Sequence, residues 1–237
     1  MNYLAYSSIL VIISCAITSF LLFTKSQDNK AGIIWGLFCF MGSMWGIGVF
    51  IVSTTKDYPT AILGWQIANI ATIAAPVIHH HFVLAYLKIK KSLQLFILYS
   101  LALGFVILNF TKPHLYLGEL KFVFNEFFYI YWPNNKNITY LIMYWGEYWA
   151  LLLYSFTLLL IAYCKSEGAA KNRLKYIILG STVAWIGTHH DFLPAFGFDT
   201  YPYLNITLGI FPFIISYAVI RPQVLDINIV FNRSLVS

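Results

Sequence analysis

Charged residues are scarce in this chain of 237 residues: Asp, Glu, Lys and Arg make up 10% of it, against about 25% in typical soluble domains. Apolar residues make up 59%, and the mean hydropathy is +0.72. The few charges fall in short clusters between apolar runs of about 20 residues, the length that crosses a lipid bilayer. The composition therefore excludes an ordinary soluble domain and predicts an all-α integral membrane protein.

Residues for catalysis and metal binding are also few. The three cysteines, Cys15, Cys39 and Cys164, form no metal-ligand spacing and no even disulfide set. No phosphate-binding glycine loop or nucleophile motif is present. The six histidines form no spaced histidine boxes, and the last apolar run lacks the lysine of a retinal receptor. We therefore expect no enzyme activity, no cofactor and no metal site in this chain.

Seven apolar runs are predicted to be membrane-spanning helices. They cover about residues 3–23, 31–53, 59–87, 93–110, 139–163, 176–188 and 203–220. The first run is followed by Lys25 and preceded by no basic residue, which is the reverse of a signal peptide.

The basic residues predict the orientation of these helices. With seven spans, 11 of the 15 basic residues fall on one side, and Lys56, Lys112, Lys121 and Lys136 fall on the other. The positive-inside rule then places the N-terminus outside the cell membrane and the C-terminus in the cytoplasm. It also explains the net charge of +6 without a nucleic-acid partner.

Residues 1–220 are expected to form one seven-helix domain in the lipid bilayer, and residues 221–237 a cytoplasmic linker to an output domain that the chain lacks. The longest connection, residues 111–138, is predicted to lie outside and is rich in aromatic side chains. Leu120, Phe122 and Phe124 alternate with other residues, a pattern compatible with a short strand or hairpin. This segment is either a lid over a pocket or a layer among the lipid headgroups, and the aromatic content slightly favours the headgroups.

Polar residues inside the predicted helices are candidates for function, because polar groups are costly in hydrocarbon. Glu147 is the only acidic residue in the fifth run and lies between Trp145 and Trp149. Burial favours the neutral form of a carboxyl, which can donate a hydrogen bond to a ligand or respond to protons. A hydrogen bond to a neighbouring helix is an alternative of equal weight.

A polar face runs along the third predicted helix. Its members, which follow one another at steps of three and four, are Trp65, Asn69, Thr72, Pro76 and His80. Such a face must look into the bundle or a cavity. The predicted ligand pocket lies in the outer half of the bundle and comprises Trp65, Gln66, Asn69, Trp145, Glu147, Trp149 and His190.

Two further patterns concern packing. The consecutive residues His79, His80 and His81 point about 100° apart on a helix, so they cannot all bind one metal. We expect one of them inside the bundle and the others directed towards the inner headgroups. In the second run, Gly32 with Gly36 and Gly42 with Gly46 allow close helix approach, within the bundle or across a dimer.

The end of the chain carries a resemblance to a known family. Thr200-Tyr-Pro-Tyr-Leu-Asn205 opens the last run, and a tail follows that contains Ile220-Arg-Pro, Leu225-Asp-Ile and Arg233-Ser-Leu-Val. This resembles the N-terminal seven-transmembrane sensor region of bacterial sensor histidine kinases. The segment from Gly187 to Phe198 also looks like that family's connection before the final helix. The earlier helices match mainly by hydropathy.

The resemblance implies a sensory module that detects a small ligand or a membrane-derived stimulus. It implies that the seventh helix passes the signal to a cytoplasmic kinase or cyclase domain, through a linker with Asp226 and Arg233. Relatives of this kind work as dimers, so a homodimer is implied too. Two alternatives remain: a small transporter or proton-linked channel subunit, and a structural anchor whose polar groups only lock the helices together.

Overall fold

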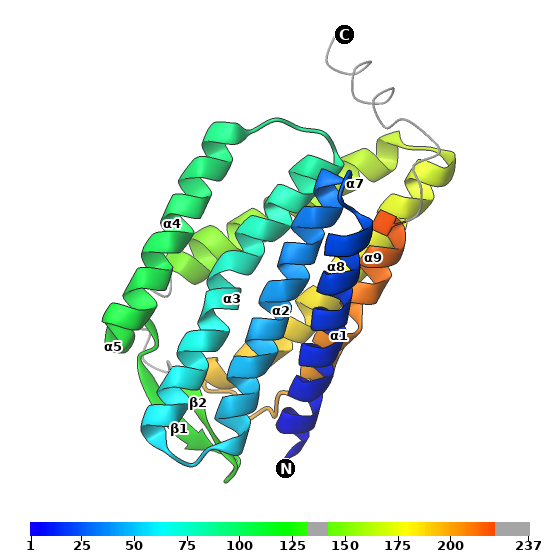
Figure 1. Ribbon diagram of the computed structural model, residues 1–237. Coiled ribbons are helices and arrows are strands. Elements are labelled where there is room, and N and C mark those ends of the chain that lie inside the picture. Colours follow the sequence, from blue (N-terminus) through cyan, green and yellow to red (C-terminus); the bar gives the residue numbers. More distant parts are fainter. Residues whose placement is uncertain (132–141, 221–237) are drawn as a thin grey trace.

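The computed structural model describes residues 1–131 and 142–220, apart from the side chains of Glu147 and Ile220. This part of the chain is a bundle of long helices with a small hairpin at one end (Figure 1). The bundle begins with α1 (Tyr3–Lys25), α2 (Lys30–Thr54) and α3 (Tyr58–Tyr86), and α4 (Ser92–Thr111) packs against α3. After the short α5 (Pro113–Tyr116), strands β1 (Glu119–Val123) and β2 (Phe127–Tyr131) form the hairpin.

The second half of the bundle contains the less regular helices. A π-helix, η1 (Ile142–Trp149), continues into α7 (Ala150–Lys165), and α8 (Gly168–Phe192) follows. Two 3-10 helices, η2 (Leu193–Phe196) and η3 (Tyr203–Gly209), precede α9 (Phe211–Ile220).

The first three helices begin at side-chain caps. Asn2 accepts a hydrogen bond from the Ala5 N–H at 2.9 Å, and Asn29 and Asp57 cap α2 and α3 in the same way. These side chains satisfy backbone donors that the first turn of a helix leaves without partners. The sequence therefore marks where each of these helices starts.

Glycines let α1, α2 and α3 approach closely. A Cβ atom on Gly48 of α2 would lie 2.4 Å from the Ala68 backbone nitrogen of α3. Gly42 and Gly46 face Cys15 and Ile12 of α1 in the same manner. The glycine pairs of α2 thus serve packing within this chain, as small residues do in membrane bundles.

Among the described residues, five helices are long and apolar enough to cross a membrane: α1, α2, α3, α4 and the continuous helix η1–α7. α8 has 25 residues, but Lys171, Arg173 and Lys175 occupy its first turns. The last apolar helix, Tyr203–Val219, is shorter. The prediction of an all-α membrane bundle is confirmed. The count of seven spans and their orientation in the membrane remain predictions.

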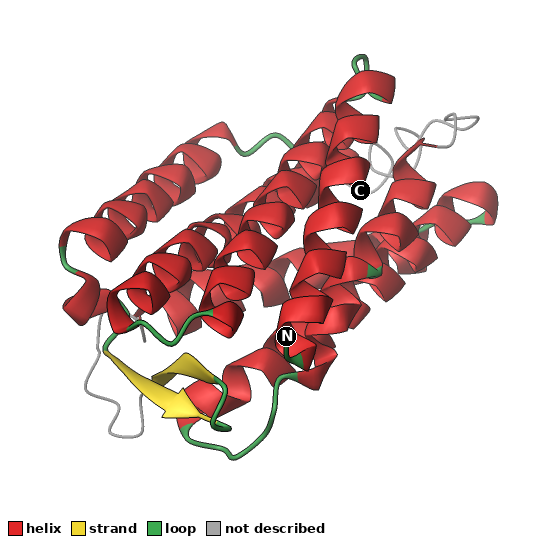
Figure 2. Cartoon of the chain, turned by 60° about the horizontal axis from the view of Figure 1, so that its bottom comes forward, coloured by secondary structure: helices red, strands yellow, loops and turns green. Residues whose placement is uncertain are grey.

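The hairpin covers the end of the bundle at which residue 1 lies, which is called the hairpin end below (Figure 2). Leu120 pairs with Ile130 and Phe122 with Phe128 in an antiparallel register, so of the two forms with which the alternation was compatible, a strand or a hairpin, the structure has the hairpin. Phe124 and Asn125 in the turn have φ angles of 53° and 55°, the left-handed conformation that matches the twist of a tight hairpin. The side chains of Phe127 and Tyr129 in β2 are buried against the bundle.

Candidate functional site

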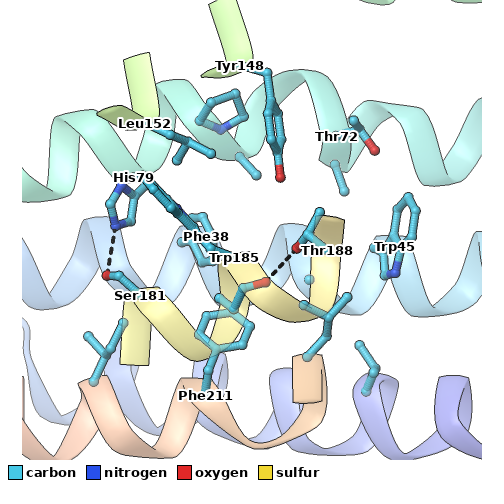
Figure 3. A pocket seen from close by; sticks show the side chains of 18 of the residues that line it. Phe38, Trp45, Thr72, His79, Tyr148, Leu152, Ser181, Trp185, Thr188 and Phe211 are labelled. Atoms are coloured by element: carbon cyan, nitrogen blue, oxygen red, sulfur yellow. Dashed lines mark hydrogen bonds between the residues drawn. The ribbon is translucent and has the colours of Figure 1, made fainter. Parts of the chain in front are cut away.

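A cavity of about 100 Å³ lies in the middle of the bundle (Figure 3). Side chains from both halves of the chain surround it. The described lining residues are Val11, Trp35, Phe38, Gly42, Trp45, Ala71, Thr72, Ala75, Pro76, His79, Tyr148, Leu152, Ser181, Ala184, Trp185, Thr188, Leu208, Phe211 and Ile215. The cavity is therefore a point where α1, α2 and α3 meet the helices η1–α7, α8 and η3–α9.

Three helix irregularities meet at this cavity. Pro76 of α3 lines it and has no N–H to donate to the carbonyl of Thr72, another lining residue. Tyr148 lines it from the π-helix η1, and Leu208 and Phe211 line it on either side of the junction between η3 and α9. Irregular backbone at membrane depth is tolerated where it is buried in protein or lines a cavity, and π and 3-10 segments often mark functional sites.

The break in the last helix is stabilised by α1. Pro212 has no N–H to donate to the Leu208 carbonyl, which lies four residues before it. The Cys15 thiol donates to that carbonyl instead, with 3.7 Å between sulfur and oxygen. Asn205 of η3 adds two bonds, accepting from Trp45 Nε1 at 3.2 Å and donating to Ser7 Oγ at 2.8 Å. Side chains of α1 and α2 thus hold η3 in place beside the cavity.

Hydroxyl groups and one imidazole provide the polarity of the cavity. His79 Nε2 and Ser181 Oγ are 3.2 Å apart, and the other ring nitrogen of His79 is buried with no hydrogen-bond partner among the described residues. Nearer the hairpin end, the Tyr148 hydroxyl faces Thr188, whose own hydroxyl donates to the Ala184 carbonyl at 2.8 Å (Figure 3). The cavity is apolar with a polar group towards each end.

The three consecutive histidines reach three different helices. His79 contacts Ser181 of α8, His80 Nδ1 lies 2.8 Å from Ser155 Oγ of α7, and His81 Nδ1 lies 3.0 Å from the Tyr99 hydroxyl of α4. The predicted divergence of about 100° is thus observed. The expectation of a single buried histidine is wrong, because both His79 and His80 are buried; seryl hydroxyls on α7 and α8 give each of them a partner inside the bundle.

Trp65 and Tyr129 make hydrogen bonds that attach the hairpin to the bundle. Trp65 Nε1 of α3 donates to the Phe128 carbonyl at 3.0 Å, and its ring meets the Tyr129 ring edge-on at 4.7 Å. The Tyr129 hydroxyl donates to the Asp191 carbonyl at the end of α8. Burial raises the pKa of this tyrosine, so the hydroxyl keeps its proton.

Gln66 and Asn69, also predicted to line a pocket, are buried in helix contacts. Gln66 Nε2 donates to the Asn109 carbonyl of α4, Asn109 Nδ2 donates to the Gln66 carbonyl, and both distances are 2.9 Å. Asn69 is 1% exposed, and its amide nitrogen has no hydrogen-bond partner among the described residues. Gln66 therefore joins α3 to α4. The side-chain N–H groups of Asn69 are buried without an acceptor among the described residues.

The remaining predicted residues lie along η1 and the end of α8. Trp149 packs on His189 with ring centroids 4.0 Å apart, and Trp145 stacks on Trp149 while 57% of its own surface is exposed. The Glu147 side chain lies outside the described structure. Of the six predicted pocket residues whose side chains are described, none lines the central cavity. Asp226 and Arg233 lie outside the described residues.

Asp191 is a buried acid that the predicted pocket did not include. Its side chain is 2% exposed, and neither carboxylate oxygen has a hydrogen-bond partner among the described residues. His190 Nδ1 lies 3.8 Å from Oδ1, too far for a hydrogen bond. The sequence shows Asp191 as an acid near the end of an apolar run, which could have marked it as a candidate. Its burial could not be predicted, because it involves the hairpin, whose Tyr129 bonds to the Asp191 carbonyl.

Metal binding has no support in the described part of the chain, where no three His, Cys, Asp or Glu side chains gather into a group that could hold an ion. The fold and the central cavity define a multi-pass helical membrane protein with a small internal site.

Comparison with known protein families identifies the family of this chain. Residues 7–228 match the family described as the N-terminal 7TM region of histidine kinase, so the chain belongs to this family. The matched region is the non-catalytic N-terminal part of such kinases. No curated protein and no solved structure matches the chain. The family match supports the predicted sensor class and gives the transporter alternative no support.

Proposed function

We propose that this chain is the sensory input region of a histidine kinase, with seven spans, the N-terminus outside and the C-terminus in the cytoplasm of the bacterial inner membrane. The family match over residues 7–228 carries this proposal. The count of seven adds α8 and the η3–α9 segment to the five long apolar helices. The eleven basic residues on the predicted inner side support the orientation.

The signal would travel through the last helix. Phe211 and Ile215 of α9 line the cavity, so whatever alters the cavity acts directly on the helix that leads to residues 221–237. α8 packs on this helix without space between them, since a Cβ on Gly180 would lie 2.5 Å from Ile215 Cγ1. A stimulus that moves α8 or fills the cavity would therefore displace α9 relative to α1 and α2.

We also propose a role in signalling for the seven predicted pocket residues, Trp65, Gln66, Asn69, Trp145, Glu147, Trp149 and His190. Trp65, through the hairpin, and Trp149, through His189, connect the outer half of the bundle to the cavity-lining helices α3 and α8. Glu147 precedes Tyr148, a cavity residue. We propose that stimuli acting on the hairpin end reach the cavity through these side chains, and that Asp226 and Arg233 orient the linker.

A chimera tests the function. Residues 1–237 are fused to the cytoplasmic phospho-acceptor and ATP-binding domains of a histidine kinase, and autophosphorylation is measured in membrane vesicles. Phe211→Ala removes a cavity contact of α9, whereas Phe213→Ala alters a half-exposed side chain of the same helix and serves as the matched control. We expect Phe211→Ala to change autophosphorylation severalfold and Phe213→Ala to leave it unchanged.

A second chimera carries an unrelated membrane anchor in place of residues 1–220. If this chimera responds to stimuli as the first one does, or if both phenylalanine variants behave like the parent, the sensory assignment is wrong. Glu147→Gln in the first chimera tests that residue separately, because unchanged signalling to every stimulus would remove it from the mechanism.

A further inference from the structure

We infer that the central cavity binds a small, neutral, mostly apolar molecule that carries one hydrogen-bond donor, such as an alcohol hydroxyl. This names the ligand class for the input, and its use in signalling rests on the proposed function. Binding itself is a property of the bundle and can be measured without a kinase.

The size and the apolar walls of the cavity indicate how large the apolar part of the ligand can be. The volume of about 100 Å³ is of the order of engineered apolar cavities that take up benzene. Trp35, Phe38 and Phe211 form aromatic walls, and Leu152 and Ile215 add aliphatic ones. Apolar pockets with few polar groups are the usual form of small-molecule sites.

The described lining residues include no carboxylate, ammonium or guanidinium group. An ion transferred from water into such surroundings would lose its hydration without gaining a partner. The ligand that fits is therefore neutral.

Several polar hydrogens of the cavity walls are already used inside the protein, whereas the threonine oxygens can accept further hydrogen bonds. Three tryptophans line the walls, and the two buried ones use their indole N–H groups elsewhere, Trp35 with Ser216 Oγ at 3.1 Å and Trp45 with Asn205 Oδ1 at 3.2 Å; Trp185 is half-buried. The Thr188 hydroxyl uses its proton on the Ala184 carbonyl, so its oxygen keeps lone pairs for a donor, and the oxygen of the Tyr148 hydroxyl that faces it can accept a hydrogen bond as well.

Thr72 adds to this set of acceptors. Its hydroxyl donates along its own helix to the Ala68 carbonyl at 3.5 Å, and Pro76 supplies no N–H to the Thr72 carbonyl. In Figure 3 the Tyr148 hydroxyl points into the space between Thr72 and Thr188. A ligand hydroxyl placed there would donate to Tyr148 and rest its apolar body against the tryptophan and phenylalanine rings.

The buried His79 is an independent sign that the cavity receives a polar group. It is 4% exposed and lines the cavity, and one ring nitrogen has no hydrogen-bond partner among the described residues. A buried polar atom without a partner is costly unless something satisfies it. A ligand or water inside the cavity would do so.

The test uses the purified chain in lipid nanodiscs and three probes of similar shape. Benzyl alcohol is neutral and carries a hydroxyl, ethylbenzene lacks the donor, and benzylammonium carries a charge. At about ten times the dissociation constant of benzyl alcohol we expect the Tm to rise by about 3 °C. We expect a smaller rise with ethylbenzene and none with benzylammonium.

A matched pair of variants separates the cavity from effects of the lipid. Ala75→Leu fills the cavity from α3, while Ala150→Leu makes the same change on the exposed face of α7. The rise in Tm with benzyl alcohol should disappear in Ala75→Leu and persist in Ala150→Leu. If Ala75→Leu does not fold, Ala184→Leu fills the cavity from α8 and replaces it.

Tyr148→Phe tests the polar contact. We expect it to weaken benzyl alcohol binding about fivefold and to leave ethylbenzene binding unchanged. Equal shifts in Ala75→Leu and the unaltered chain, no shift with benzyl alcohol, or an equal response to benzylammonium would each overturn the inference. These results involve no kinase, so they leave the sensory function to be decided by the chimeras.

Discussion

The Tyr201 hydroxyl donates a hydrogen bond to Glu126 Oε2 at 2.8 Å and accepts one from the Leu4 N–H at 3.4 Å. Glu126 belongs to the hairpin turn, Leu4 to the first turn of α1, and Tyr201 to the segment that leads into η3. One side chain therefore joins the hairpin to the first and last helices. Burial raises the pKa of Tyr201, and the bond to Glu126 raises it further, so the tyrosine remains a donor.

Removing this hydroxyl should loosen the hairpin end. We expect Tyr201→Phe to lower the free energy of unfolding by about 1.5 kcal/mol, because the bond to a charged acceptor is lost. Thermal unfolding of the chain in detergent measures the change. Tyr203→Phe is the matched control: its side chain is 57% exposed, and the expected change is below about 0.5 kcal/mol. Equal effects of the two substitutions would contradict the role given to Tyr201.

The contact between Gly48 and α3 should tolerate no side chain. A Cβ on Gly48 would lie 2.4 Å from the Ala68 nitrogen and 2.5 Å from the Gly64 oxygen, both backbone atoms that cannot turn aside. Gly48→Ala should therefore destabilise the bundle by about 2 kcal/mol or more. At Gly104 of α4 nothing lies within 4 Å of the added carbon, and Gly104→Ala should stabilise the helix by up to about 1 kcal/mol. Unfolding by a denaturing detergent compares the two, and a neutral Gly48→Ala would show that α2 and α3 are not in firm contact.

The bond between His80 and Ser155 should be measurable by a double-mutant cycle. The cycle of His80→Phe and Ser155→Ala should give a coupling energy of about 0.6 kcal/mol and no more than about 1.7 kcal/mol, the range found for hydrogen bonds between membrane helices. A cycle of His81→Phe with Ser155→Ala should give none, because His81 contacts Tyr99 of α4 instead. Coupling in the second cycle, or its absence from the first, would refute the divergence of the histidines.

The cap of α3 should respond to acid. Asp57 accepts hydrogen bonds from the Thr60 N–H at 3.0 Å and the Thr60 hydroxyl at 2.6 Å, which lower the pKa of its carboxyl. A lowered pKa in the folded state means that the carboxylate contributes stability above about pH 4, where the unfolded chain is ionised. That contribution is lost as the pH falls through the folded-state value.

Asp57→Asn keeps a capping side chain but cannot titrate. We expect the Tm difference between the unaltered chain and Asp57→Asn to be larger at pH 7 than at pH 3, while Asp57→Ala lowers the Tm at pH 7. A Tm difference that does not depend on pH would mean that the carboxylate does not cap the helix.

Sequence patterns with a local cause predicted the fold well. The apolar runs predicted the helices because span length is set by the bilayer, and the alternation at Leu120, Phe122 and Phe124 was compatible with the hairpin because strands repeat every two residues. The divergence of His79, His80 and His81 follows from the rotation per residue of a helix. The η1 π-helix and the η3 3-10 helix were not predicted, because they depend on how neighbouring helices satisfy the backbone.

The candidate site depended on contacts between distant segments. Trp65 and Gln66 are neighbours in the chain, yet one binds the hairpin and the other binds α4. Tyr148 lines the cavity from the end of a π-helix, whose extra residue per turn rotates the side chains that follow it. The cavity is lined by residues of eight helical elements, α1, α2, α3, η1, α7, α8, η3 and α9, and no local pattern indicates which of them meet.

The winding of η3 sets the length of the last helical segment. Seven residues, Tyr203–Gly209, are wound as a 3-10 helix, which rises about 2.0 Å per residue where an α-helix rises about 1.5 Å. The same seven residues would be about 3.5 Å shorter as an α-helix. Rewinding of η3 would therefore shift α9 along its own axis by that length, and the contacts of η3 with Ser7, Cys15 and Trp45 oppose such a shift.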